Sequence, residues 1–148
     1  MMVISGIVEQ GKHLGRRLGF PTANIHPLSA DEPWPANGVY VAALWVAGDA
    51  RARLGMLNQG VHPTVPEGKP TIEIHLPDFH ADLYGQPVRV EYLRFLRPER
   101  RFDSLNTLIA QLERDRDAVS AWLDTALKGA DDSPAAVRAR EILWHGNP

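Results

Sequence analysis

The residues best placed to bind a charged ligand lie near the start of the chain, where glycines alternate with basic side chains. Glycine lets the backbone approach a ligand closely and turn its amide groups inward, and the cations add local positive charge. Such a segment is typical of a polyphosphate site. Its spacing matches neither standard phosphate-binding motif, so the spacing alone favours a surface hairpin whose glycines only form turns. The residues concerned are Gly11, Gly15, Gly19, Lys12, Arg16 and Arg17.

A proline-led motif follows directly. Pro21 fixes its own backbone φ, and Thr22 and Asn24 stand two residues apart. Their hydroxyl and amide oxygens can therefore point at one ion or phosphate. The alternative is a turn in which both side chains bond to their own backbone, and taken by itself the motif favours that turn.

One carboxylate stands in the middle of a strand-like segment. Over residues 71–76, Glu73 and His75 share one face, and Ile72 and Ile74 share the other. A carboxylate on the polar face of a strand is commonly solvated. If it points into the mouth of a barrel instead, it can act as a general base. The pattern leaves both interpretations open.

A basic link over residues 94–102 joins the last strand-like segment to the helical part of the chain. Its guanidinium groups could bind an anion or stack on a planar ring. The alternative is a solvated loop whose charge is balanced in part by Glu99 and Asp103. The arginines are Arg94, Arg97, Arg100 and Arg101.

Short segments with turn residues between them must position these groups. Apolar alternation and β-branched residues predict strands over 3–10, 38–47, 51–57, 71–76 and 87–95. Residues 11–37 and 58–70 are rich in glycine and proline, and this composition predicts loops. Several short strands in succession indicate an antiparallel barrel or sandwich.

The hydrophobic period then changes from two to that of a helix. The change predicts a helix capped by Asp103 or Ser104 and ended by Gly129. A second helix is expected over 135–144, with Ser133 and Pro134 as its N-cap and first residue. The fold class is therefore mainly β, with helices at the C-terminal end.

Composition excludes several classes of function. The 148 residues fit one ordinary domain, and a net charge of −2 gives no strong field for nucleic acid or an anionic membrane. The absence of cysteine removes disulfides, thiolate metal sites and a cysteine nucleophile. No signal peptide is evident, and no apolar run approaches the ~20 residues of a membrane span. We expect a cytoplasmic monomer with no nucleic-acid or membrane partner.

Taken together and in order, these blocks resemble the ATP-dependent riboflavin kinases. The glycine-rich segment that runs into Pro-Thr-Ala-Asn is followed by the family's second loop at 58–64. The E-x-H-L…D-F…D-L-Y-G segment lies at 73–85, and the R-x-E…F-x-S-L entry to the helix lies at 97–105. Residues 111–118 resemble the family's pattern on that helix. The resemblance covers about residues 4–122.

The resemblance implies a fold and a reaction. The fold is a small closed antiparallel β-barrel of the Greek-key type, six-stranded, with a helix packed on it over residues 1–128; a helical tail over 129–148 would follow. The reaction transfers the γ-phosphate of ATP to the 5′-hydroxyl of riboflavin, with Mg²⁺, and gives FMN and ADP. A non-catalytic flavin- or nucleotide-binding module is the alternative, and a barrel that binds nucleic acid is a third reading that the net charge disfavours.

By resemblance, individual residues also receive roles. Thr22 and Asn24 would hold Mg²⁺ with the phosphate oxygens, and Glu73 would take the proton of the ribityl hydroxyl. Arg97 and Asp115 would help to hold the flavin. The segment that would cover the nucleotide phosphates contains Gly11, Lys12, Gly15, Arg16, Gly19 and Pro21.

The sequence also departs from the family. Bacterial members usually carry an N-terminal adenylyltransferase domain that makes FAD, whereas the kinase-like segment here begins at about residue 4. The chain is therefore expected to be either a free-standing kinase or an excised kinase domain, and FAD synthesis is not ascribed to it. A separate FMN adenylyltransferase is a candidate partner. Gln59 replaces a usually apolar residue, and Pro77 stands where leucine is common. The tail after residue 128 has no counterpart in the family, and either docks on the barrel or faces a partner.

Overall fold

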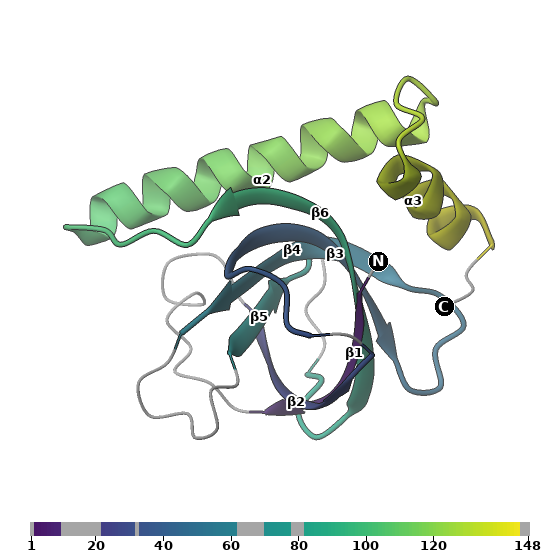
Figure 1. Cartoon of the computed structure of the whole chain (residues 1–148), viewed down its shortest axis with the longest axis horizontal. Coiled ribbons are helices and arrows are strands. Elements are labelled where there is room, and N and C mark those ends of the chain that lie inside the picture. Colours follow the sequence, from purple (N-terminus) through teal and green to yellow (C-terminus); the bar gives the residue numbers. More distant parts are fainter. Residues whose placement is uncertain (1, 10–21, 32, 62–69, 78–81, 146–148) are drawn as a thin grey trace.

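The computed structural model describes residues 2–9, 22–31, 33–61, 70–77 and 82–145. Within these ranges, the structure consists of strands followed by helices (Figure 1). The elements are β1 (Val3–Glu9), β2 (Ala23–Ala30), β3 (Gly38–Val46), β4 (Arg53–Gly60), β5 (Thr71–His75), β6 (Pro87–Pro98), α2 (Leu105–Leu127) and α3 (Pro134–His145).

The strands close into one barrel in the order β1-β2-β5-β4-β3-β6, with every neighbouring pair antiparallel. Strands β3, β4 and β5 are consecutive neighbours, and β6 returns to lie beside β3, which is the Greek-key arrangement. The closed six-stranded barrel implied by the family resemblance is therefore confirmed.

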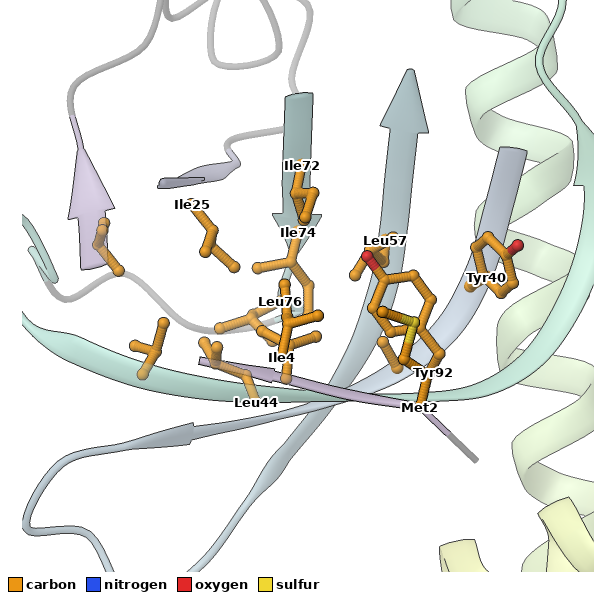
Figure 2. Packing of buried hydrophobic residues seen from close by; sticks show 14 of the residues in the cluster. Met2, Ile4, Ile25, Tyr40, Leu44, Leu57, Ile72, Ile74, Leu76 and Tyr92 are labelled. Carbon is orange, nitrogen blue, oxygen red and sulfur yellow. The ribbon is translucent and has the colours of Figure 1, made fainter. Parts of the chain in front are cut away.

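Alternate residues of each strand fill the inside of the barrel. Figure 2 shows the packing of this interior, in which hydrocarbon side chains from several strands meet. Its most deeply buried members are Ile4, Ile25, Leu44, Leu57, Ile72, Ile74 and Val90. Because the interior is filled by its own side chains, a polar ligand must bind on the outer surface or at an end of the barrel.

A second apolar cluster joins the helices to the outer face of the barrel. Val41 and Trp45 of β3 and Met56 of β4 pack there with Trp122 of α2 and Ile142 of α3. Figure 1 shows α2 lying along β6, with α3 folded back beside the barrel. This cluster covers the outer faces of β3, β4 and β6.

The tail therefore docks on the barrel, which was one of the two outcomes expected for it. Arg138 of α3 donates from Nε and Nη2 to the two carboxylate oxygens of Glu91 on β6, at 2.7 and 3.0 Å. The Glu91 side chain is only 7% exposed, so this is a buried ion pair. Arg140 also donates to the backbone oxygens of Ala126 and Asp131.

Two loop predictions were wrong. Residues 23–30 form β2, a strand hidden from pattern analysis because Asn24 and Pro27 interrupt the apolar alternation. Pro27 faces Gly6 where the register of β1 shifts, and an irregularity of this kind tolerates a residue without an N–H group. A Cβ at Gly6 would lie 2.6 Å from the His26 carbonyl oxygen, so the close approach of the two backbones requires glycine. The other error is β4, which continues to Gly60 where a loop was expected from residue 58.

The predictions for the helix ends are confirmed. Ser104 caps α2, because its Oγ accepts from Thr107 N at 3.2 Å while Thr107 Oγ1 accepts from Ser104 N at 3.3 Å. Gly129 follows the helix at φ +77°, a conformation that favours glycine. Ser133 Oγ accepts from Ala136 N at the start of α3. Neither helix is long and apolar enough to cross a membrane.

Candidate functional site

A row of polar side chains crosses three neighbouring strands on the outer face of the barrel. Glu73 of β5 lies directly opposite Asn24 of β2 on one side and Asn58 of β4 on the other. Directly opposite residues project from the same face, with Cβ atoms about 4.5–5.5 Å apart. Their chain neighbours Ile72 and Leu57 point into the barrel, so the polar row points outward. The fold thus brings Glu73 and Asn24, which the sequence singled out, side by side.

Burial makes the carboxyl group of Glu73 a weaker acid than an ordinary surface glutamate. The side chain is half-buried, and desolvation raises the pKa of Glu73 above its ordinary value of 4.5. Across the described part of the chain, no cation pairs with Glu73 and no side chain donates a hydrogen bond to it. A carboxylate with a raised pKa is a better proton acceptor than an ordinary surface glutamate, which suits a general base.

Oxygen donors lie next to this carboxylate. Thr22 lies just before β2, and Asn24 is the second residue of that strand. Both side chains are half-buried. Within the described ranges neither side chain has a hydrogen-bonding partner, so their oxygens are available. Oxygen ligands suit Mg²⁺, which keeps several waters and is usually held by few protein groups together with substrate phosphates. Two neutral oxygen donors fit a metal shared with phosphates. Among the described residues, no group of three or more acidic, histidine or cysteine side chains is placed to hold a metal ion.

Arg97 and Asp115, the two residues expected to help to hold a flavin, contact each other. The Arg97 guanidinium donates from Nε and Nη2 to the two oxygens of Asp115, at 2.8 and 2.7 Å. Gln111 Nε2 donates to the same carboxylate at 2.9 Å. The pair is largely buried, with 18% of Arg97 and 5% of Asp115 exposed. Both Asp115 oxygens are thus occupied, and the pair joins the end of β6 to α2.

Two other arginines of the basic link, Arg94 and Arg100, also contact groups of the protein itself. Arg94 lies over the Trp122 ring, and Arg100 lies over the Phe102 ring. Arg100 and Arg114 both donate to the side-chain oxygen of Gln111. Residues 94–98 belong to β6, so this strand continues beyond residue 95, where it was expected to end.

Register places Arg97 at the far end of the polar row. Glu73 faces Asn58, Asn58 faces Val39, and Val39 faces Arg97 across β5, β4, β3 and β6. Three strand spacings of about 4.8 Å separate Glu73 from Arg97 by about 14 Å along the barrel surface. Val39 is buried, so Asn58 is the single polar side chain on this row between the carboxylate and the arginine.

Sequence analysis gave Asn58 no role in the site and placed Gln59 in a loop, whereas both lie in β4. Gln59 is fully buried, and its amide donates to Pro35 O at 2.9 Å and Asn37 Oδ1 at 3.2 Å. Its oxygen accepts from the Tyr92 hydroxyl at 2.6 Å. This departure from the family's apolar residue is therefore fully hydrogen-bonded. The alternation of Leu57 and Gln59 inside with Asn58 outside was a signal for a strand, but the following glycine and proline favoured a loop.

Several residues predicted to bind the nucleotide lie outside the described residues. They are Gly11, Lys12, Gly15, Arg16, Gly19 and Pro21. Their roles stay predictions.

The family model and the curated relatives that match this chain are all described as riboflavin kinases. The family model described as Flavokinase, riboflavin kinase, matches residues 1–123. The RNA-binding riboflavin kinase RibR of Bacillus subtilis is 44% identical over 121 residues, which cover 81% of this chain and 50% of that protein. The bifunctional riboflavin kinase/FMN adenylyltransferase of Escherichia coli K12 is 42% identical over 112 residues, which cover 76% of this chain and 35% of that protein. The chain thus spans half or less of the length of these relatives.

Solved structures support the same fold. A crystal structure described as a macrolide-efflux protein from Streptococcus pneumoniae matches with a TM-score of 0.70 at 31% identity, covering 81% of this chain and 38% of that one. Riboflavin kinase from Trypanosoma brucei matches with a TM-score of 0.57 at 24% identity, covering 83% of this chain and 80% of that one.

Proposed function

Because the chain belongs to the riboflavin kinase family, we propose that it transfers the γ-phosphoryl group of ATP to the 5′-hydroxyl of riboflavin. The products are FMN and ADP. The observation that carries this proposal is the outward row of Asn24, Glu73 and Asn58 on a barrel whose interior is closed to ligands. The row combines a proton acceptor, oxygen donors for a metal and an open face for substrates.

Glu73 is the general base in this proposal. As the 5′-oxygen of riboflavin forms its bond to the γ-phosphorus, the bond from that phosphorus to the β,γ-bridging oxygen breaks, and the hydroxyl proton passes to the Glu73 carboxylate. Phosphoryl transfer depends mostly on positioning and on neutralising charge, so one well-placed carboxylate suffices on the acceptor side. The raised pKa of Glu73 assists because a stronger base accepts the proton more readily.

Thr22 and Asn24 would hold Mg²⁺ together with the phosphates of ATP. Bound Mg²⁺ would neutralise the charge on the phosphate oxygens. Asn24 belongs to β2 and Thr22 lies just before that strand, so both donors are on the side of Glu73 away from α2. The phosphoryl donor would therefore approach Glu73 from that side.

Riboflavin would lie on the other side of Glu73 and extend toward α2. The distance of about 14 Å from Glu73 to Arg97 is comparable to a tricyclic ring with an extended five-carbon chain. Arg97 would help to hold the ring, and Asp115 would hold Arg97 and α2 in place through the bidentate ion pair. This assignment gives Asp115 a positioning role.

Further parts of the proposal concern partners. In this proposal the chain is a monomer in the cytoplasm, where ATP is available, and the FMN that it releases is the substrate of an FMN adenylyltransferase. The RNA binding in the name of the Bacillus subtilis relative belongs to that protein, and the absence of a nucleic-acid partner here stays a prediction. A flavin-binding module without catalysis has no use for a partly desolvated carboxylate beside metal donors, so the kinase is favoured.

The proposal is tested with the purified chain, riboflavin, ATP and Mg²⁺, with FMN and FAD separated by chromatography. We expect FMN to form with a matching amount of ADP and no FAD. ADP without FMN would show an ATPase instead. If neither product forms and protein quenches riboflavin fluorescence, the chain is a binding module and the kinase proposal is wrong.

A further inference from the structure

We propose that Asn58 determines specificity for the polyhydroxyl chain of the acceptor, by hydrogen-bonding a secondary hydroxyl of riboflavin next to the reacting one. The proposal rests on the kinase function proposed above. It extends that function by assigning a substrate contact to Asn58, the first residue of the segment 58–64 that resembles the family's second loop and to which sequence analysis assigned no role.

Asn58 lies beside Glu73, on the side where the acceptor would bind. Asn58 lies directly opposite Glu73, one strand spacing of about 4.8 Å nearer to α2. Asn24 lies at the same spacing on the opposite side, next to Thr22. Glu73 therefore lies between two different surfaces. On one side are Thr22 and Asn24, the oxygen donors proposed for the metal, and on the other side is the amide of Asn58. In-line transfer places the attacking and leaving oxygens on opposite sides of the γ-phosphorus, so the rest of the nucleotide lies across that phosphorus from the acceptor's carbon chain.

The side-chain amide of Asn58 has the hydrogen-bonding groups that a sugar-alcohol hydroxyl needs. The Asn58 side chain is exposed, and within the described residues its amide makes no hydrogen bond. A primary amide offers two donors and an acceptor, which match the donor and acceptor character of a sugar-alcohol hydroxyl. The next residue along the row toward Arg97 is the buried Val39, which offers no polar atom from its side chain. Asn58 is thus the polar group of this row that faces the middle of an acceptor spanning Glu73 and Arg97.

Hydrogen bonds of the neighbouring residues hold the backbone of β4 rigidly at Asn58. The adjacent residue Gln59 is anchored inside the barrel by hydrogen bonds to Pro35, Asn37 and Tyr92. Beyond it, Thr71 Oγ1 donates to Gly60 O, and Glu99 Oε1 accepts from Val61 N. Contacts that fix the backbone on both faces of a strand hold an outward side chain in one place, which is what discrimination between similar substrates requires.

The test compares two acceptors and three proteins. The acceptors are riboflavin and a flavin whose ribityl chain is replaced by a 5-hydroxypentyl chain, which keeps the reacting hydroxyl and lacks the secondary ones. The proteins are the wild type, Asn58→Ala and Asn58→Leu, whose side chain is similar in size. For wild type we expect kcat/KM to favour riboflavin by at least about 10-fold, the discrimination of one lost hydrogen bond.

Either substitution should remove most of that preference. We expect kcat/KM for riboflavin to fall about 10-fold and kcat/KM for the hydroxypentyl flavin to change less than about 2-fold. An equal loss with both acceptors would show that Asn58 acts on the fold or on Glu73, and would overturn the proposal. No change with either acceptor would overturn it too.

Binding separates this inference from the kinase proposal. Quenching of flavin fluorescence gives dissociation constants for both flavins without any turnover. If wild type forms no FMN but binds riboflavin about 10-fold more tightly than the hydroxypentyl flavin, and Asn58→Ala abolishes the difference, the contact is supported and the kinase assignment fails. If FMN forms and the two flavins bind alike in both proteins, the kinase assignment stands and the contact is refuted.

Discussion

The outer surface of the barrel has two halves that use the same strand geometry for opposite purposes. On β3 and β6, outward residues such as Val41, Trp45 and Leu93 are buried under α2 and α3. On β2 and β5, the outward residues Asn24 and Glu73 are polar and only half-buried. Strand β4 belongs to both halves, since Met56 packs under the helices and Asn58, two residues on, faces the site.

The difference shows where this small domain gains stability and where it gives some up. Covering an apolar face removes hydrocarbon from water, which stabilises by roughly 25 cal/mol per Å². Leaving a desolvated carboxylate on the other face costs free energy that only function explains. Substitutions in the helix-covered half should therefore change stability, and substitutions in the polar half should change activity.

The largest expected effect is on turnover in the polar half. Glu73→Gln keeps the shape of the side chain and removes the proton acceptor, so we expect kcat to fall by about 10²–10⁴-fold, with riboflavin binding largely intact. Single-turnover FMN formation and fluorescence quenching measure the two quantities. Glu113→Gln is the matched control, because Glu113 is exposed on α2. Equal turnover in wild type and Glu73→Gln would remove Glu73 from the role of base.

The helix-covered half should give the largest effect on stability. Ile142 of α3 is 1% exposed within the cluster that joins both helices to the barrel. Ile142→Ala should lower the free energy of unfolding by about 2–5 kcal/mol, because it removes buried methyl groups and leaves a cavity. Urea denaturation measures this change. Turnover per folded molecule should stay within about 2-fold of wild type, and a large loss there would mean that α3 belongs to the site.

The sequence predicted the interior of the barrel better than its outer face. β-Branched and aromatic residues identified β3. Alternation identified β5, in which Ile72 and Ile74 share the buried side. It missed β2, whose Pro27 is tolerated only through a register shift opposite Gly6. It also missed Asn58, because the partner of a strand residue follows from register and not from local pattern. The pairing of Arg97 with Asp115 joins a strand to a helix, and no spacing along the chain predicts such a contact.

The junction of the two halves should show an intermediate effect. Gln59→Leu would leave the Tyr92 hydroxyl and the Pro35 carbonyl without their partner inside the barrel. We expect a loss of about 1–3 kcal/mol in the free energy of unfolding, the cost of polar groups buried without hydrogen bonds. Urea denaturation again gives the value. A variant as stable as wild type would show that an apolar residue repacks this end of the barrel, as the family's usual residue type suggests.

The smallest expected effect is a gain in the stability of the Glu73→Gln variant, in the polar half. Desolvation raises the pKa of Glu73 above the 4.5 of an unperturbed glutamate. The folded state therefore binds this proton more tightly than the unfolded state does. The resulting stabilisation is fully present below the unfolded pKa and is lost as pH rises through the folded pKa.

At neutral pH the charged Glu73 carboxylate therefore lowers the free energy of unfolding, and an uncharged glutamine at this position does not. Glu73→Gln should unfold at a higher urea concentration than wild type at pH 7, and the two midpoints should converge as pH falls toward and below about 4.5. Glu113→Gln, at an exposed position on α2, is measured alongside as the control for the substitution itself. A difference between Glu73→Gln and wild type that does not vary with pH would instead reflect packing. The combination of higher stability with lost turnover in one variant would identify Glu73 as a residue kept for catalysis at the expense of the fold.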